Sequence, residues 1–157
     1  EWYRLHIEHQ RSCLIKPAFK SLILLMEYLR ERGEEYITGR YVDRDRDAVM
    51  FDIDDTLIFI SGAPNTPMIA LLQQAKVLGY KIVIITARPN ISPVINSTVD
   101  QLKRHGIEFD HIGFVPAEEK GLLKRKSGFN YILSVGDMDT DLTDSTHALN
   151  TSNFYHI

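Results

Sequence analysis

The chain has 157 residues, of which 44% are hydrophobic, and it carries a formal net charge of −3 at pH 7. This mild acidity gives no overall attraction to nucleic acid or to an anionic membrane, and no apolar run is long enough to cross a bilayer. The single cysteine, Cys13, excludes an intrachain disulfide framework. We expect one domain over residues 1–157, no membrane partner and a cytoplasmic location. A removed leader segment stays open, since the chain begins at Glu1.

The first 47 residues are expected to form an arm and a helix that pack on a catalytic core at 48–157. Residues 1–16 show no clear periodicity. From Pro17, apolar residues recur at spacings of three and four, which predicts a helix that stops at Gly33. We interpret residues 34–47 as a connector, and its alternating charges from Asp43 to Asp47 as a solvated entry to the first strand.

Strand and helix patterns then alternate along the rest of the chain. The expected elements are a strand at 49–53, a short excursion at 58–64, a helix from Asn65 or Thr66 to Gly79 with Pro67 at its start, a strand at 81–86, a helix from Ser92 to Gly106, a strand at 111–115, a helix after Pro116 that ends at Gly128, a strand at 131–135 and a last short strand at 154–157. This alternation predicts an α/β fold, a Rossmann-like parallel sheet flanked by helices. In such sheets ligands bind beyond the carboxyl ends of the strands.

The stretch 48–57 combines a buried strand with acidic residues. Its apolar half runs directly into three carboxylates, Asp52, Asp54 and Asp55, and then Thr56. Carboxylates this dense repel one another unless something neutralises them, and a divalent cation bound through oxygen is the usual remedy. The alternative is a plain acidic turn, because aspartate also favours turns for its own hydrogen bonds.

Further polar residues follow the later strands. Thr86, Asp137 and Asp141 all come at or just after a predicted strand end, and Lys120 lies on a helix that could reach them. Because the carboxyl ends of parallel strands meet at one edge of a sheet, we expect these groups to converge there.

Taken together, these groups suit phosphoryl transfer. Asp52 and Asp137 could share one Mg²⁺, with a backbone carbonyl of the first loop completing the protein's ligands. Attack of a carboxylate on phosphorus would give an aspartyl-phosphate, and Asp54 could protonate the leaving oxygen and later deprotonate water. The Thr86 hydroxyl and the Lys120 ammonium would hold the transferring phosphoryl oxygens.

Four motifs, in this order, resemble those of the haloacid dehalogenase superfamily. Asp52-Ile53-Asp54-Asp55-Thr56 matches its D-x-D-x-T signature, and Ile84-Ile85-Thr86 matches an apolar strand that ends in Thr or Ser. Lys120 fits the third motif, and the stretch from Gly136 to Asp141 fits the fourth, G-D-x-x-x-D. The resemblance covers about residues 48–145. The helical segment before the first motif is similar to that of the acid-phosphatase-like branch.

This resemblance implies a role for each matched residue, and Mg²⁺ as the cofactor. The roles are Asp52 as nucleophile and metal ligand, Asp54 as acid/base with its backbone carbonyl on the metal, Thr86 and Lys120 as phosphate holders, Asp137 as metal ligand and Asp141 as a supporting carboxylate.

Two assignments stay open. Lys124 lies near Lys120 and the third motif has no fixed spacing; we prefer Lys120 because the stretch 120–124 resembles the lysine-x-x-x-basic start of that helix in acid-phosphatase-like members. Arg88, two residues after Thr86, either touches substrate or is a solvated loop cation.

The stretches of chain between the motifs are too short to hold a cap domain, an inserted domain that would cover the substrate. We therefore expect an open site. The first hypothesis is a Mg²⁺-dependent phosphomonoesterase acting on a small phosphomonoester or on a macromolecular phosphate. The alternative is a nucleic-acid-end or nucleotide phosphatase, similar to the phosphatase half of polynucleotide kinase-phosphatases, against which the acidic net charge counts. A third hypothesis is a non-catalytic phosphate-binding or signalling module. The oligomeric state is not predicted.

Overall fold

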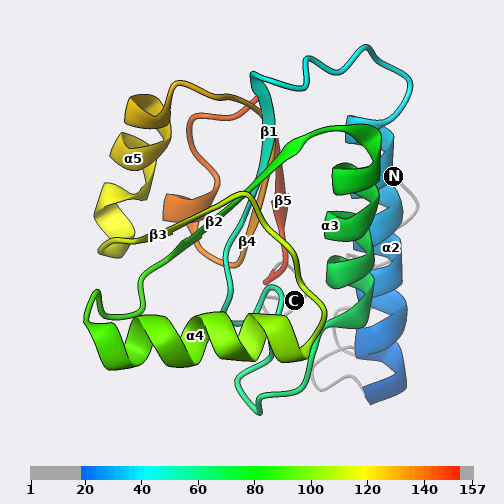
Figure 1. Ribbon diagram of the computed structural model, residues 1–157. Helices are drawn as coiled ribbons and strands as arrows, with labels where there is room; N and C mark the ends of the chain where they lie inside the picture. The colour runs from blue at the N-terminus through cyan, green and yellow to red at the C-terminus, as the bar shows by residue number, and fades with distance from the viewer. Residues whose placement is uncertain (1–18, 153–157) are drawn as a thin grey trace.

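A five-stranded parallel sheet forms the centre of the molecule. The computed structural model describes residues 19–152, and the strand order is β3-β2-β1-β4-β5. The strands are β1 Asp47–Phe51, β2 Lys81–Thr86, β3 His111–Phe114, β4 Asn130–Gly136 and β5 His147–Asn150, and every neighbouring pair is parallel (Figure 1). The chain leaves β1 toward β2 on one side and later returns to β4 on the other. The strand order therefore reverses beside β1, where such sheets bind ligands.

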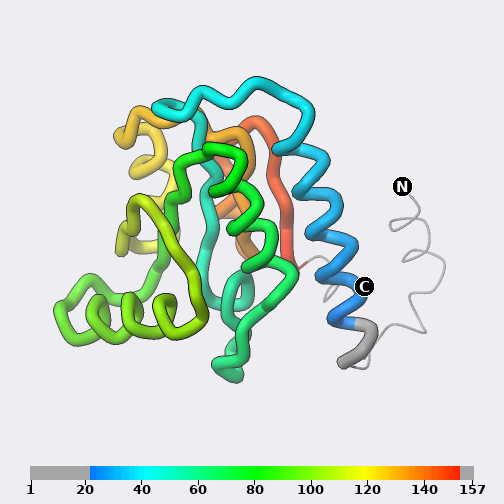
Figure 2. The backbone as a smooth tube through the Cα atoms, turned by 45° about the vertical axis from the view of Figure 1, so that its right-hand side comes forward, coloured from blue at the N-terminus to red at the C-terminus, as the bar shows by residue number. Residues whose placement is uncertain are grey.

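Helices cover both faces of this sheet. They are α2 Phe19–Ile37, α3 Thr66–Leu78, α4 Ser92–Arg104 and α5 Lys120–Ser127, with short 3₁₀ turns η2 Ala117–Glu119 and η3 Asp139–Asp141. Helices α2 and α3 lie side by side on one face, whereas α5 lies on the other (Figures 1 and 2). In both views α4 runs crosswise to α3, near the carboxyl ends of the strands. The α/β fold with a Rossmann-like parallel sheet is confirmed.

The two faces of the sheet carry separate apolar clusters. Side chains such as Val49 and Phe51 pack under α2 and α3, while Ala48 and Met50 point to the α5 face beside Tyr131. All five residues of β1 are buried, as expected of a central parallel strand. Each large apolar side chain buried in this way contributes about 1.5–3 kcal/mol. The residues that follow β1 and β4 are thus held in place by a well-packed core.

Gly33 does not end the first helix, so that prediction is wrong. Helix α2 continues to Ile37. A Cβ at Gly33 would lie 2.5 Å from Cδ2 of Leu71 on α3. The missing side chain therefore serves the close approach of two helices and not a helix stop.

Helix α3 begins and ends where its sequence indicates. Pro67 lies in its first turn, and Gly79 closes it in the left-handed conformation with φ 105°. The side chain of Asn65 makes no capping bond; its Nδ2 donates instead to the Thr56 carbonyl at 2.9 Å. The start of α3 is thereby tied to the loop after β1.

The end of the sheet differs from the prediction. Strand β5 at His147–Asn150 has no counterpart among the predicted strands, because it is short and contains only two apolar residues. The predicted strand at 154–157 and the N-terminal arm at 1–16 lie outside the described residues. The other strand ends agree with the prediction to within two residues. None of the helices in residues 19–152 is both long and apolar enough to cross a membrane.

Candidate metal and phosphate site

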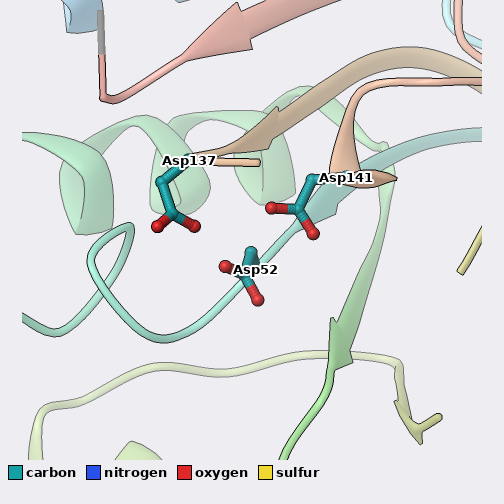
Figure 3. A group of neighbouring side chains, drawn as sticks. All are labelled: Asp52, Asp137 and Asp141. Carbon is teal, nitrogen blue, oxygen red and sulfur yellow. The ribbon is translucent and has the colours of Figure 1, made fainter. Parts of the chain in front are cut away.

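Three carboxylates converge beyond the carboxyl ends of β1 and β4. Asp52 follows β1 directly, Asp137 follows β4, and Asp141 is the last residue of η3. One oxygen from each carboxylate lies within 4.8 Å of the others, and Figure 3 shows the three groups turned toward one another. The pairing of β1 with β4 explains the arrangement, since the Asp52 amide donates to the Val135 carbonyl at 3.0 Å. The predicted convergence of Asp52, Asp137 and Asp141 is therefore present in the structure.

One ammonium group lies within this acidic cluster. Lys120 is the first residue of α5, and its Nζ donates to Asp52 Oδ1 at 2.9 Å and to Asp141 Oδ1 at 2.6 Å. Burial by itself would lower the pKa of Lys120, but the two carboxylates outweigh burial and the pKa is raised. Lys120 is therefore held in its charged form, directly beside Asp52.

One ammonium does not offset three carboxylates. Burial, followed by the charge of Asp141, raises the pKa of Asp52 to about 8, although Lys120 acts in the opposite direction. Burial also raises the pKa of Asp137. Among the described residues, Lys120 alone does not compensate the fully ionised cluster, and the candidate ligand atoms are all carboxylate oxygens. A hard divalent cation such as Mg²⁺ suits this set of ligands.

Lys124 lies one helical turn further along α5, and its ammonium group has different partners from that of Lys120. It is buried, and its Nζ donates to three oxygens that carry no full charge: Ser134 Oγ at 2.9 Å, and the carbonyls of Asp141 and Thr143, both at 2.6 Å. Burial lowers its pKa to about 8. Lys124 therefore fastens the loop after β4 to α5, and Lys120 is the lysine that reaches Asp52. This geometry favours Lys120 over Lys124 as the phosphate-holding lysine, a role that stays a prediction.

Asp54 lies apart from the acidic cluster. Its carboxylate forms a two-pronged ion pair with Arg88, Nη2 to Oδ1 at 2.8 Å and Nε to Oδ2 at 3.1 Å. Arg88 also donates through Nη1 to Thr98 and Gln101 of α4. Arg88 is thus a well-anchored group and not a solvated loop cation. Nothing in the sequence motif pairs Arg88 with Asp54, because the contact depends on how two loops and a helix meet.

Thr86 ends β2 and is fully buried. Its Oγ1 accepts a hydrogen bond from the Arg88 amide at 3.1 Å, so the hydroxyl keeps its own proton to donate. The loop after Asp54 is compact, since Asp55 has φ 59° and its Oδ1 accepts from the Ile60 amide at 3.1 Å. Thr151, which the motifs did not single out, donates through Oγ1 to the Asp55 carbonyl. Both contacts fix the loop that carries Asp54.

Comparison with known proteins identifies the fold. No protein-family model and no curated protein matches the chain. The chain resembles a class C acid phosphatase from Bacillus anthracis, solved with tungstate bound, at 18% identity and a TM-score of 0.61, covering 85% of this chain and 71% of that one.

Two further similar structures contain the Pnkp1/Rnl/Hen1 complex, one of them described as an RNA repair complex. Each matches at 20% identity and a TM-score of 0.51 and covers 66% of this chain. The chain spans less than half of those chains, 44% and 40%. At such identities these similarities show that the chain shares its fold with those proteins.

Proposed function

We propose that this protein is a Mg²⁺-dependent phosphomonoesterase that acts through an aspartyl-phosphate on Asp52. The observation that carries the proposal is the convergence of Asp52, Asp137 and Asp141 with Lys120 at the switch point of the sheet. Perturbed carboxylates that converge in this way are characteristic of functional sites. The similarity in fold to a class C acid phosphatase supports the same reaction class.

The residues that would hold the cation are Asp52, Asp137 and the backbone carbonyl of Asp54. Asp141 has a supporting role, because its Oδ1 accepts from Lys120 and its Oδ2 from the Met138 amide at 3.1 Å. When bound, Mg²⁺ would screen the negative charges and so allow an anionic carboxylate and a phosphate to come together.

The chain's own residues account for both half-reactions. A carboxylate oxygen of Asp52 attacks phosphorus, the bond from phosphorus to the ester oxygen breaks, and Asp54 gives that oxygen a proton. Asp54 then takes a proton from water, whose oxygen displaces Asp52 from phosphorus and releases inorganic phosphate. Thr86 and Lys120 hold the phosphoryl oxygens while their charge is redistributed.

The substrate class follows from how little covers this end of the sheet. Between β1 and β2 the described chain holds one compact loop and α3, and between β2 and α5 it holds α4, β3 and η2. No inserted domain lies over the site in residues 19–152. An open site suits a small phosphomonoester or a phosphate on a larger molecule.

A nucleic-acid-end phosphatase is the second candidate. It is supported by the similarity to chains of the Pnkp1/Rnl/Hen1 RNA repair complex. The net charge of −3 counts against it, since nucleic-acid-binding proteins usually carry a basic footprint.

Hydrolysis of an aryl phosphate tests the proposal. Wild-type protein should need Mg²⁺ and lose activity with a chelator, and Asp52→Asn should lose at least about 1,000-fold in kcat. Asp47→Asn is a matched control, because Asp47 is a buried aspartate at the other end of the same strand.

Each other outcome contradicts a particular part of the proposal. Metal-dependent activity that survives in Asp52→Asn would mean that the nucleophile is wrong. Hydrolysis of a 3′-phosphorylated oligonucleotide without hydrolysis of the aryl ester would favour the second candidate. Folded protein that neither binds Mg²⁺ nor hydrolyses either substrate would favour a non-catalytic module.

A further inference from the structure

The ion pair between Arg88 and Asp54 connects two loops at the site. Asp54 lies three residues after the end of β1, and Arg88 lies two residues after the end of β2. The guanidinium presents Nε and Nη2 to the two oxygens of one carboxylate. This two-pronged geometry fixes the plane of the carboxylate as well as its place, which a single hydrogen bond would not do.

Helix α4 holds the guanidinium from its other side. Nη1 of Arg88 donates to Thr98 Oγ1 at 3.1 Å and to Gln101 Oε1 at 2.9 Å, and Thr98 is fully buried. These contacts depend on α4 running crosswise near the carboxyl ends of the strands (Figure 1). The position of α4 therefore determines the position of Arg88, and Arg88 determines that of Asp54.

Exposed ion pairs usually contribute little, and the Asp54 side chain is 56% exposed. A lone aspartate so exposed would occupy several rotamers. Arg88 differs from an ordinary surface partner because its side chain is only 20% exposed and donates four side-chain hydrogen bonds. The pair is thus arranged to orient Asp54 and to offset its negative charge.

We propose that Arg88 is a positioning residue, which acts through Asp54: it holds the carboxyl group in one orientation, so that the proton Asp54 takes from water in one turnover passes to the leaving oxygen in the next. The proposal rests on the proposed phosphatase function and adds a residue to it. Preorientation of a catalytic group by a fixed partner is a general source of rate. Offsetting the charge of Asp54 also removes a repulsion that an incoming phosphate would meet.

A choice of leaving group tests this role. Protonation of the leaving oxygen matters greatly for an alkyl phosphate and little for p-nitrophenyl phosphate, whose leaving group departs as an anion. Arg88→Met should lower kcat on an alkyl phosphate about 30-fold and on p-nitrophenyl phosphate at most about threefold, with KM within about twofold. A purely structural defect would lower both rates equally, which would overturn the proposal.

A double-mutant cycle separates positioning from substrate binding. If Arg88 acts through Asp54, the double variant Asp54→Asn/Arg88→Met should be no slower on the alkyl phosphate than Asp54→Asn alone, within about threefold. Additive losses, or a KM raised tenfold or more in Arg88→Met, would show that Arg88 binds substrate directly and would overturn the proposal.

The anchor on α4 gives a milder variant that preserves the ion pair. Gln101→Ala removes one acceptor of the guanidinium and should reproduce the leaving-group pattern at about a threefold loss on the alkyl phosphate. Arg88→Lys keeps the positive charge but cannot make the two-pronged contact with Asp54. Its kcat on the alkyl phosphate should lie between those of wild type and Arg88→Met. These two variants carry the test if Arg88→Met does not fold. If each of the two variants lost the same factor in kcat on the alkyl phosphate as on p-nitrophenyl phosphate, the proposal would be overturned.

A control variant and the wild type complete the experiment. Arg30→Met breaks ion pairs with Glu27 and Glu34 on α2 and should leave both rates unchanged. Wild-type protein that hydrolyses neither ester would contradict the proposed function itself. Active wild type with an additive double variant would contradict the role of Arg88 alone.

Discussion

The two ends of β1 present the same side chain in opposite environments. Asp47 begins the strand and Asp52 follows its last residue, and both are buried, with 4% and 6% exposed. At the amino end every oxygen has a donor: the Asp43 amide at 3.0 Å and Arg40 at 3.2 Å on Oδ2, and Asn130 Nδ2 at 3.0 Å on Oδ1. Burial opposes ionisation of Asp47, but these partners outweigh it and the pKa is lowered.

At the carboxyl end the compensation is incomplete. Asp52 shares one ammonium with Asp141 and faces Asp137 as well, and its pKa rises to about 8. The Asp47 carboxylate, at the start of β1, is therefore fully paired within the protein. The Asp52 carboxyl group, just after the end of β1, has too few cationic partners to stabilise its ionised form. A buried charge that the fold leaves uncompensated is better explained by a ligand than by stability.

Supplying the missing positive charge should have the largest effect on stability. Mg²⁺ at about 100 times its dissociation constant should raise the free energy of unfolding by about 2.7 kcal/mol, measured as a shift of the melting temperature. Asp137→Asn should lose most of this shift because it removes a proposed ligand, whereas Asp47→Asn should keep it. An equal shift in Asp137→Asn would place the cation elsewhere.

At the amino end of β1, a loss of stability is expected when the charge of Asp47 is removed. Asp47→Asn should lower the free energy of unfolding by about 2 kcal/mol at pH 7, because the charge is lost and one of the two oxygens becomes an NH2 group that faces a donor, either Asn130 or the pair of Asp43 and Arg40. The folded-state pKa of Asp47 lies below the model-peptide value of 3.8, so its contribution is complete above that pH and is lost as pH falls through the folded value. In urea titrations the difference from wild type should shrink below about pH 4.

Asp45→Asn is the control for this prediction. Asp45 is exposed and only two residues before Asp47, and its substitution should change stability by less than about 0.5 kcal/mol. A difference between Asp47→Asn and wild type that stays constant down to pH 2 would mean that the charge of Asp47 is not what stabilises this end.

The alternation of elements, and the convergence at the strand ends, could be predicted from the sequence. Apolar strands at 81–86 and 131–135 and polar residues after them follow directly from periodicity and motif order. The burial of Asp47 could not be predicted in the same way, because Asp47 stands in a run of alternating charges, which is typical of a solvated segment, and the structure buries it. Its burial depends on Arg40 and Asn130, which are brought to it by the fold.

Other differences have the same origin in long-range contacts. Gly33 has the local signature of a helix stop, but its partner Leu71 lies on another helix. Arg88 follows Thr86 in sequence, yet its contacts with Asp54 and Gln101 join elements that no local pattern relates. Local sequence thus predicts which groups reach the site, while tertiary packing determines how they are oriented.

The smallest change in stability is expected for a substitution of Asp52, just after the carboxyl end of β1, in protein without metal. Asp52→Asn removes one of three converging carboxylates while Lys120 keeps Asp141, so with a chelator the variant should be more stable than wild type by about 1 kcal/mol at pH 9. The sign follows from the raised pKa: the cost of ionising buried Asp52 is absent well below pH 4 and complete above about pH 8. The gain in the free energy of unfolding, measured by urea titration, should therefore fade as pH is lowered toward 4. Its sign is opposite to that of the Asp47→Asn effect, which is a loss of stability. Destabilisation of Asp52→Asn as large as that of Asp47→Asn would show that Lys120 already neutralises the cluster, and that the two ends of β1 are alike.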